Sequence, residues 1–273
     1  VDASQMEGNY RLEGENRVLH CADRIVTATP AEQSQLEFLY NAPSRQITII
    51  PPGVDLSRFY PISKDEAKAA IDIPPRERLL LFVGRIEPLK GIDTLIRAVA
   101  LMQMTHSLEC CPHYLAIIGG DPEETDQQVN KEMVRLQALA HELGVRDLVL
   151  FLGKRDQETL PYYYSAADAV VMPSHYESFG MVALEAMACG TPVVASQVGG
   201  LAYLVRDGET GYFVPDGEPE KLADRLTRLL LEPEISQRFS QKAVEIAQEY
   251  SWDKISHQIL RLYEKTLAQY NRG

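Results

Sequence analysis

The sequence predicts an α/β protein built on a doubly wound parallel sheet, and three observations support that prediction. Short apolar runs rich in β-branched residues recur from about residue 78. Helix-like stretches separate these runs, and such alternation is typical of a parallel sheet that is covered by helices on both faces. Glycines and charged residues gather where the runs end, which is the edge at which open α/β sheets bind ligands.

Six apolar runs form the expected strands. They are RLLLFVGR (78–85), HYLAIIGG (113–120), LVLFLGK (148–154), AVVMPS (169–174), PVVAS (192–196) and GYFVP (211–215). The expected helices lie around 93–104, 126–143, 159–167, 180–189, 200–206 and 218–231. Strands that are apolar throughout are buried on both faces, so we expect a Rossmann-like domain over 78–250.

A smaller βαβ-like piece precedes this domain. It consists of RIVTAT (24–29), a helix from about Pro30 to Tyr40, and QITIIPPGVD (46–55), whose Pro-Pro-Gly indicates a linker. After 235 the chain is expected to be helical to near its end, with an interruption around Tyr250–Trp252. The predicted domains are 1–55, the tail of a preceding domain plus linker; 56–250, the ligand-binding domain; and 251–273, a terminal helix.

Composition narrows the function classes. The 273 residues carry a net charge of −12, so no basic field exists to hold nucleic acid or an anionic membrane surface. No apolar run reaches the roughly 18 residues that span a bilayer, and no signal peptide opens the sequence. Four cysteines without metal-ligand spacing are typical of reduced thiols, so a cytoplasmic location is expected. The start, VDASQMEGNY, resembles a cut site and suggests a fragment.

The expected carboxyl ends of the strands carry the candidate functional residues. These are Gly84-Arg85, Gly119-Gly120-Asp121, Gly153-Lys154-Arg155, Ser174 through Gly180, and Ser196 through Gly200. Glycine lets backbone approach a ligand closely. Arg85 and Lys90, both in GRIEPLKG, suit a diphosphate, because arginine offers a planar fork of donors and lysine a point charge. Solvated loop charges are the alternative interpretation.

The segment PSHYESFGMVALEAMACG (173–190) is the most informative. Its helix is expected to begin near Gly180, so the free amides of Phe179, Gly180 and Met181 form an anion site. Glu185 is the only charge in that otherwise apolar helix, and a buried carboxylate needs partners.

Ribose hydroxyls are suitable partners for Glu185, and a hydrogen bond to core backbone is the alternative. Glu177 precedes the helix and can sit at the sugar end of a ligand whose ribose lies against Glu185. His175 adjoins the site and is expected to be a neighbour without ligand contact.

Two common nucleotide motifs are absent from the sequence. No G-x-G-x-x-G follows the first strand, which disfavours a dinucleotide dehydrogenase, and no G-x-x-x-x-G-K-[ST] occurs, which excludes a P-loop NTPase. The six histidines form no metal constellation, so no metal site is predicted.

Together, GRIEPLKG, ESFGMVALEAMACGTPVVASQVGG and VRDGETGYFVP resemble glycosyltransferase family 4, the retaining GT-B enzymes. The nearest likeness is to the branch of sucrose-phosphate synthase and the mycothiol-pathway glycosyltransferases. HCADRIVTAT and IIPPGVDLSRF share the likeness, which therefore covers essentially all 273 residues.

The resemblance implies roles for particular residues. Arg85 and Lys90 would hold the donor diphosphate, and Gly84 would also belong to the donor site. Glu177 would contact the transferred sugar, and Glu185 would bind the ribose. The amides of Phe179, Gly180 and Met181 would reach sugar hydroxyls and phosphate. Lys154 and Arg155 would frame the base. Members of the family carry a full acceptor-binding domain, of which only a short remnant is recognisable here, and the final helix resembles the segment that crosses back onto that domain.

The resemblance implies retaining transfer of a sugar from a nucleoside diphosphate sugar, with uridine as the default base, to an unidentified acceptor hydroxyl. The resemblance implies that no cofactor is required, and a loosely bound magnesium ion is the alternative. The expected partners are the donor and the missing acceptor domain, and the exposed fragment is expected to self-associate and to be inactive alone. A GT-B nucleotide-sugar epimerase and a donor-binding module without turnover are the alternatives.

Overall fold

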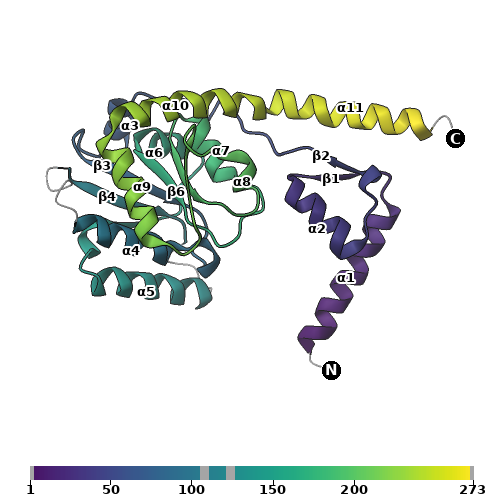
Figure 1. Ribbon diagram of the computed structural model, residues 1–273, viewed down its shortest axis with the longest axis horizontal. Coiled ribbons are helices and arrows are strands. Elements are labelled where there is room, and N and C mark those ends of the chain that lie inside the picture. The colour runs from purple at the N-terminus through teal and green to yellow at the C-terminus, as the bar shows by residue number, and fades with distance from the viewer. Residues whose placement is uncertain (1–2, 105–110, 121–126, 271–273) are drawn as a thin grey trace. The chain divides into compact units, whose positions relative to one another are not determined.

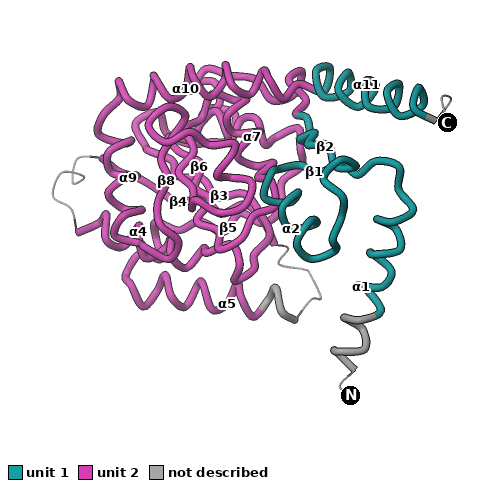
Figure 2. Tube along the Cα trace, turned by 45° about the vertical axis from the view of Figure 1, so that its right-hand side comes forward, with its two compact units in different colours: residues 1–53, 252–273 teal, residues 54–251 magenta. Residues whose placement is uncertain are grey.

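The computed structural model describes residues 3–104, 111–120 and 127–270. The chain forms two compact units (Figure 2). One comprises residues 1–53 and 252–273, and the other comprises residues 54–251. The larger unit contains the six expected strands and all of the candidate site residues.

A six-stranded parallel sheet organises the larger unit (Figure 1). Its order is β5-β4-β3-β6-β7-β8, and every neighbouring pair is parallel. The strands are β3 (Arg78–Val83), β4 (His113–Ile118), β5 (Val149–Gly153), β6 (Ala169–Met172), β7 (Val193–Ser196) and β8 (Gly211–Val214). This order reverses direction between β3 and β6, so the doubly wound fold class is confirmed, and its ligand crevice is expected at the carboxyl ends of these two strands.

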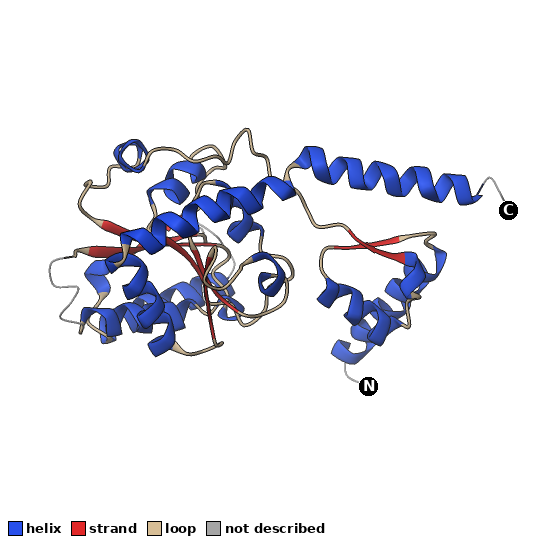
Figure 3. Cartoon of the chain, turned by 45° about the horizontal axis from the view of Figure 1, so that its top comes forward, coloured by secondary structure: helices blue, strands red, loops and turns tan. Residues whose placement is uncertain are grey.

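Helices cover both faces of this sheet (Figure 3). On one face, Leu80 and Phe82 of β3 join a core with α4, α5 and α9. On the other face, α6 packs against β3, α3 and α7, and α10 packs on α7. The helices are α3 (Lys64–Ala70), α4 (Ile92–Gln103), α5 (Gln127–Glu142), α6 (Leu160–Ala166), α7 (Met181–Ala188), α8 (Leu201–Leu204), α9 (Pro219–Leu231) and α10 (Pro233–Ala247).

The smaller unit contains α1 (Ala3–Cys21), α2 (Pro30–Tyr40), the parallel pair β1 (Ile25–Thr27) and β2 (Ile47–Ile49), and α11 (Trp252–Tyr270). The start of α2 is encoded locally, because Thr29 accepts a hydrogen bond from the Glu32 amide and Pro30 occupies the first turn. A small core of Ile25, Ala42 and Ile47 closes this βαβ arrangement.

Two helices were not predicted from the sequence. α1 has few apolar residues at helical spacing, so the pattern on which the prediction rests is weak there. α3 is only seven residues long, but Ser63 caps it by accepting from the Glu66 amide at 3.4 Å. That Ser-x-x-Glu spacing is a capping-box signature that was available in the sequence. Within the described ranges, no helix is both long and apolar enough to span a membrane.

Candidate functional site

The carboxyl ends of β3, β4 and β5 approach one another through glycines. The Gly84 amide donates to the Ile118 carbonyl at 2.9 Å, and the Gly119 amide donates to the Gly153 carbonyl at 3.1 Å. A Cβ atom on Gly119 would lie 1.8 Å from the Gly84 carbonyl oxygen. Close packing of the strand ends therefore explains why glycine occupies these positions, even without a bound ligand. Asp121 lies outside the described residues.

Lys90 and Glu177 are brought together by the fold. Lys90 ends the 3-10 turn η2 (Pro88–Lys90) after β3, and Glu177 lies in the loop after β6. Lys90 Nζ lies 2.6 Å from Glu177 Oε2, and the two side chains are only 17% and 14% exposed. Because β3 and β6 are neighbours at the reversal of strand order, this ion pair lies at the place where the topology predicts a ligand crevice.

Backbone contacts fix the two loops that carry this pair. The His175 amide donates to the Leu89 carbonyl at 2.9 Å, next to Lys90. Gly91, with φ of 62°, lies so close to the β6 loop that a Cβ atom there would be 2.0 Å from the Pro173 carbonyl oxygen. On the other side of Glu177, its carbonyl accepts from the Gly200 amide at 2.9 Å. Backbone contacts thus fix the two loops from which the Lys90 and Glu177 side chains extend.

Arg85 lies apart from the Lys90–Glu177 pair. Its guanidinium forms an ion pair with Glu87 at 2.7 Å, and its side chain is 78% exposed. A pair this exposed contributes little to stability and is readily exchanged for another anion. The structure therefore places Arg85 on the same loop as Lys90, with a partner that competes only weakly for its charge.

Helix α7 begins as the sequence predicted. Gly180 caps it with φ of 100°, and no side chain accepts from its first amides. The first turn of any helix leaves backbone amides without intrahelical partners, so Met181 and the residues beside it offer donors and the positive end of the helix dipole. Phe179 is buried, and its ring lies 6.1 Å from that of Tyr250.

Glu185 has a specific side-chain partner inside the fold. The Tyr164 hydroxyl donates to Glu185 Oε2 at 2.8 Å. Burial raises the pKa of the Glu185 carboxyl, and the Tyr164 hydrogen bond opposes that rise only in part. The pKa of Tyr164 is also raised, chiefly by burial and secondly by the Glu185 charge. The sequence predicts ribose hydroxyls as partners of Glu185, with core backbone as the alternative, and the Tyr164 hydroxyl is a third kind of partner.

This raised pKa predicts how Glu185 affects stability. Above pH 4.5, the usual pKa of the group, the unfolded chain loses the proton while the folded chain keeps it. The unfolded state is therefore favoured increasingly as pH rises towards the folded pKa, and the full penalty persists above it. Glu185→Gln removes this titration, so the variant does not lose stability as pH rises. The unfolding free energy of the variant minus that of the parent should therefore be larger at pH 7 than at pH 4.

Urea denaturation of both proteins across this pH range measures the difference. Glu142→Gln, on the exposed surface of α5, is the matched control, because it removes an exposed carboxylate where Glu185→Gln removes a half-buried one. A Glu185→Gln difference that does not vary with pH would contradict the buried-carboxylate interpretation.

Lys154 and Arg155 follow β5, at the outer edge of the sheet. The Arg155 guanidinium donates to the Tyr163 hydroxyl and to the Lys154 carbonyl, both at 3.1 Å. It also lies 6.0 Å from the centre of the Tyr163 ring. Both residues are exposed. The Arg155 side chain turns along α6 and lines a pocket with Tyr163 and Leu150, which neither Lys90 nor Glu177 lines.

Ser174 and His175 belong to the segment that the sequence singled out, but their surroundings were not predicted. Ser174, directly after the Pro173 turn, is buried, and its hydroxyl has no hydrogen-bond partner in the described part of the chain. His175 Nδ1 lies 2.6 Å from Asp216 Oδ1, which joins the β6 loop to the loop after β8. Such pairings between distant loops leave no periodic signal in a sequence. Over the described residues, no group of three His, Cys, Asp or Glu is arranged to hold a metal ion.

Comparison with known proteins identifies relatives of this chain. A sequence model of the family described as glycosyl transferases group 1 matches residues 63–246. The D-inositol 3-phosphate glycosyltransferase of Actinosynnema mirum is 41% identical over 264 residues, which cover 96% of this chain and 62% of that protein. The chain therefore spans about three-fifths of the length of such relatives.

Solved structures share the fold. Sucrose-phosphate synthase from Thermosynechococcus elongatus superposes with a TM-score of 0.84 at 36% identity, over 96% of this chain and 62% of that one. Anabaena HepE, solved in complex with UDP and glucose, superposes with a TM-score of 0.78 at 24% identity, over 89% of this chain and 63% of that one. By the family match and the fold, this chain belongs to the glycosyl transferases group 1 family.

Proposed function

We propose that this chain supplies the donor-binding part of a glycosyltransferase that moves a sugar from a nucleoside diphosphate sugar to an acceptor hydroxyl with retention of anomeric configuration. The observation that carries the proposal is the Lys90–Glu177 ion pair, held at the reversal of strand order beside the amino end of α7. A cation, a carboxylate and free amides at one point suit a ligand that is anionic at one end and rich in hydroxyls at the other.

In this proposal the diphosphate lies between Arg85, Lys90 and the first turn of α7. Negative charge grows on the leaving diphosphate as the glycosidic bond breaks. Fixed cations and helix amides stabilise that charge more in the transition state than in the bound donor, which is the basis of electrostatic catalysis. Arg85 exchanges Glu87 for phosphate, and Lys90 lies between phosphate and Glu177.

Glu177 accepts hydrogen bonds from hydroxyls of the transferred sugar and so fixes its position over the diphosphate. Glu185, with one oxygen bonded to Tyr164, turns its remaining acceptor positions to the ribose. Lys154 and Arg155 frame the base at the outer strand ends. HepE is a fold neighbour solved with UDP, so uridine is the first base to test. The acceptor-binding residues are proposed to lie in the remaining length of the whole protein.

A calorimetric screen with UDP, GDP and ADP tests the donor site. We expect specific binding to one of the three, with a dissociation constant of roughly 10 μM to 1 mM for this chain. Arg85→Ala should weaken the nucleoside diphosphate about tenfold and leave the free nucleoside unaffected, because Arg85 is assigned to phosphate.

Arg97→Ala, which removes an exposed cation from α4, is the matched control and should change neither ligand. Equal losses of nucleoside and diphosphate in Arg85→Ala would place Arg85 elsewhere. The absence of any heat with millimolar diphosphates would refute the donor site.

A further inference from the structure

A second polar site lies at the opposite edge of the sheet from the Lys90–Glu177 pair. The strands are parallel, so the starts of β3, β6 and β7 share one edge, remote from their carboxyl ends. A cavity of about 430 Å³ opens there, lined from α3, the start of β3, the residues before β6 and β7, and helices α9 and α10. None of the residues assigned to the donor lines it.

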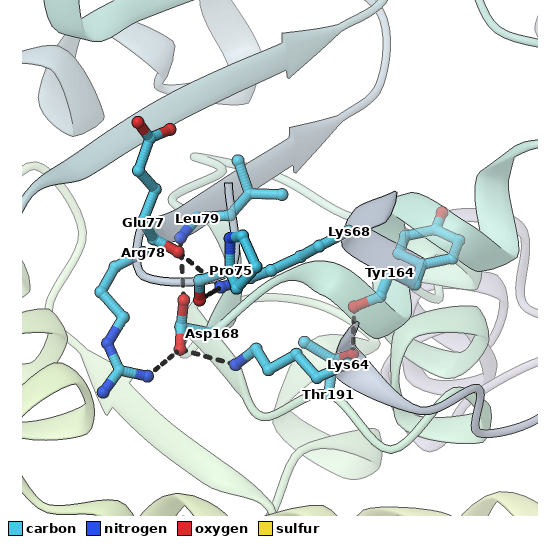
Figure 4. Close-up of polar contacts among 9 residues, drawn as sticks. All are labelled: Lys64, Lys68, Pro75, Glu77, Arg78, Leu79, Tyr164, Asp168 and Thr191. Atoms are coloured by element: carbon cyan, nitrogen blue, oxygen red, sulfur yellow. Dashed lines mark hydrogen bonds and ion pairs between the residues drawn. The ribbon is translucent and has the colours of Figure 1, made fainter. Parts of the chain in front are cut away.

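Asp168 lines this cavity and accepts three hydrogen bonds there (Figure 4). Its Oδ1 atom accepts from Lys64 Nζ at 2.6 Å and from Arg78 NH1 at 3.0 Å, and its Oδ2 atom accepts from the Leu79 amide at 2.8 Å. Asp168 is 3% exposed, whereas the side chains of Lys64 and Arg78 are 37% and 36% exposed. The carboxylate is thus buried beneath two cations that reach the cavity.

The cations lining this cavity exceed the acids. Asp168 is the only acid among the residues that line the cavity, against Lys64 and Arg78. Lys68, buried behind them, donates to the carbonyls of Pro75 and Glu77 at 2.9 and 2.5 Å and adds a further positive charge. Exposed Asp65 offsets part of that charge from outside the lining. An ammonium has three donors and a guanidinium five, so donors remain for an anion after the shared carboxylate oxygen and the Cys111 side chain, to which Arg78 also bonds.

Polar side chains of one helix also line the cavity, beside the apolar Leu229, Leu230 and Pro233. Ser236, Gln237 and Ser240 of α10 line the cavity, and their spacing places them along one side of that helix. Hydroxyl and amide groups there suit hydroxyls of a ligand. The volume lies within the range of small-molecule sites and is larger than inorganic phosphate requires.

We propose that this cavity binds the phosphate monoester of a small polyhydroxylated molecule. Lys64 and Arg78 hold the phosphate, and Ser236, Gln237 and Ser240 contact the hydroxyls. The site is separate from the donor site, and its occupation does not depend on the reaction that the donor site supports.

Amide NMR of the isotope-labelled chain tests this proposal with ribose 5-phosphate, inorganic phosphate and ribose, each at constant ionic strength and with UDP present in excess. We expect saturable shifts at the amides of Ser236, Gln237 and Ser240 with ribose 5-phosphate, weaker binding of inorganic phosphate, and no response to ribose. Equal affinities for the two phosphates would overturn the assignment of these α10 residues to the hydroxyls. If no ligand moves these amides, the whole site is refuted, whatever UDP does at α7.

Charge variants separate binding from folding. Lys64→Gln should weaken ribose 5-phosphate about tenfold, the loss expected for one charge-assisted hydrogen bond. Because this variant also disturbs Asp168, a second pair of variants on α10 leaves the Asp168 cluster intact. Gln237→Glu adds a carboxylate to the cavity wall at nearly constant size and should weaken binding three- to tenfold (order of magnitude from screened charge repulsion).

Gln248→Glu adds the same charge at the C-cap of α10, about 16 Å along the helix axis from Gln237, at an exposed residue that does not line the cavity, and should change the affinity less than twofold (order of magnitude). Equal effects of the two α10 variants would show that only the overall charge of the protein matters, and would overturn the site.

Discussion

Gly91→Ala is expected to destabilise the larger unit by about 3–5 kcal/mol and to abolish measurable binding of nucleoside diphosphates. Gly91 has φ of 62°, and a Cβ atom there would lie 2.0 Å from the Pro173 carbonyl oxygen and 3.0 Å from its carbonyl carbon. These are backbone atoms, so neither partner can rotate away. The β3 and β6 loops must move apart, and they carry Lys90 and Glu177.

Gly144→Ala is the matched control for this substitution. Gly144 has a similar φ of 72°, but a Cβ atom there would meet nothing within 4 Å. Alanine at this position therefore suffers only the left-handed backbone conformation, which costs about 1–2 kcal/mol. Urea denaturation of both variants, followed by UDP calorimetry on the folded proteins, measures the two effects. Equal destabilisation by the two substitutions would show that the approach of Gly91 to Pro173 carries no energetic weight.

The strands of the larger unit were predictable because each is a short apolar run bounded by glycine, proline or charge. RLLLFVGR predicted a strand over 78–85, and β3 occupies Arg78–Val83. Six such runs alternating with helices leave few arrangements other than a parallel sheet, so the fold class followed from the pattern. The first helix, α1, escaped prediction because it is stabilised by contacts such as that of Glu15 with Tyr40 rather than by a continuous apolar face.

The sequence predicted the individual residues of the candidate site but not which side chains contact each other. The glycine-bounded loops after β3 and β6 identified Lys90 and Glu177 separately, because strand ends in such sheets carry function. Lys90 and Glu177 are 87 residues apart in the sequence. Their side chains meet only because strands β3 and β6 are neighbours in the sheet. The same limit applies to Tyr164, which reaches Glu185 from a different helix, and no local pattern encodes that contact.

In the proposed function the Lys90–Glu177 pair serves both stability and donor binding, and a double-mutant cycle should separate the two. Both side chains are largely buried, so removing one partner leaves the other charge poorly compensated. Lys90→Met is expected to cost about 2–3 kcal/mol of unfolding free energy, since the Glu177 carboxylate is short and cannot reach water easily. Glu177→Gln should cost less, because the lysine stem lets its ammonium reach solvent. The double variant should regain most of the loss, because no uncompensated charge remains.

Nucleotide binding should not follow stability through this cycle. Lys90→Met is expected to weaken UDP binding by roughly 30- to 100-fold, because a charge-assisted contact to phosphate is lost. The double variant, although more stable than Lys90→Met, should bind UDP no better. Glu177→Gln should instead retain or tighten UDP, because Lys90 no longer divides its charge between carboxylate and phosphate, while the preference for UDP-glucose over UDP should fall. The exposed pair of Lys242 and Glu245 on α10, 2.9 Å apart, is the control, and its cycle should give a coupling below about 0.5 kcal/mol with unchanged UDP affinity. If UDP affinity recovered along with stability in the double variant, Lys90 would serve the fold alone, and the phosphate would have to be held by Arg85 and the first turn of α7.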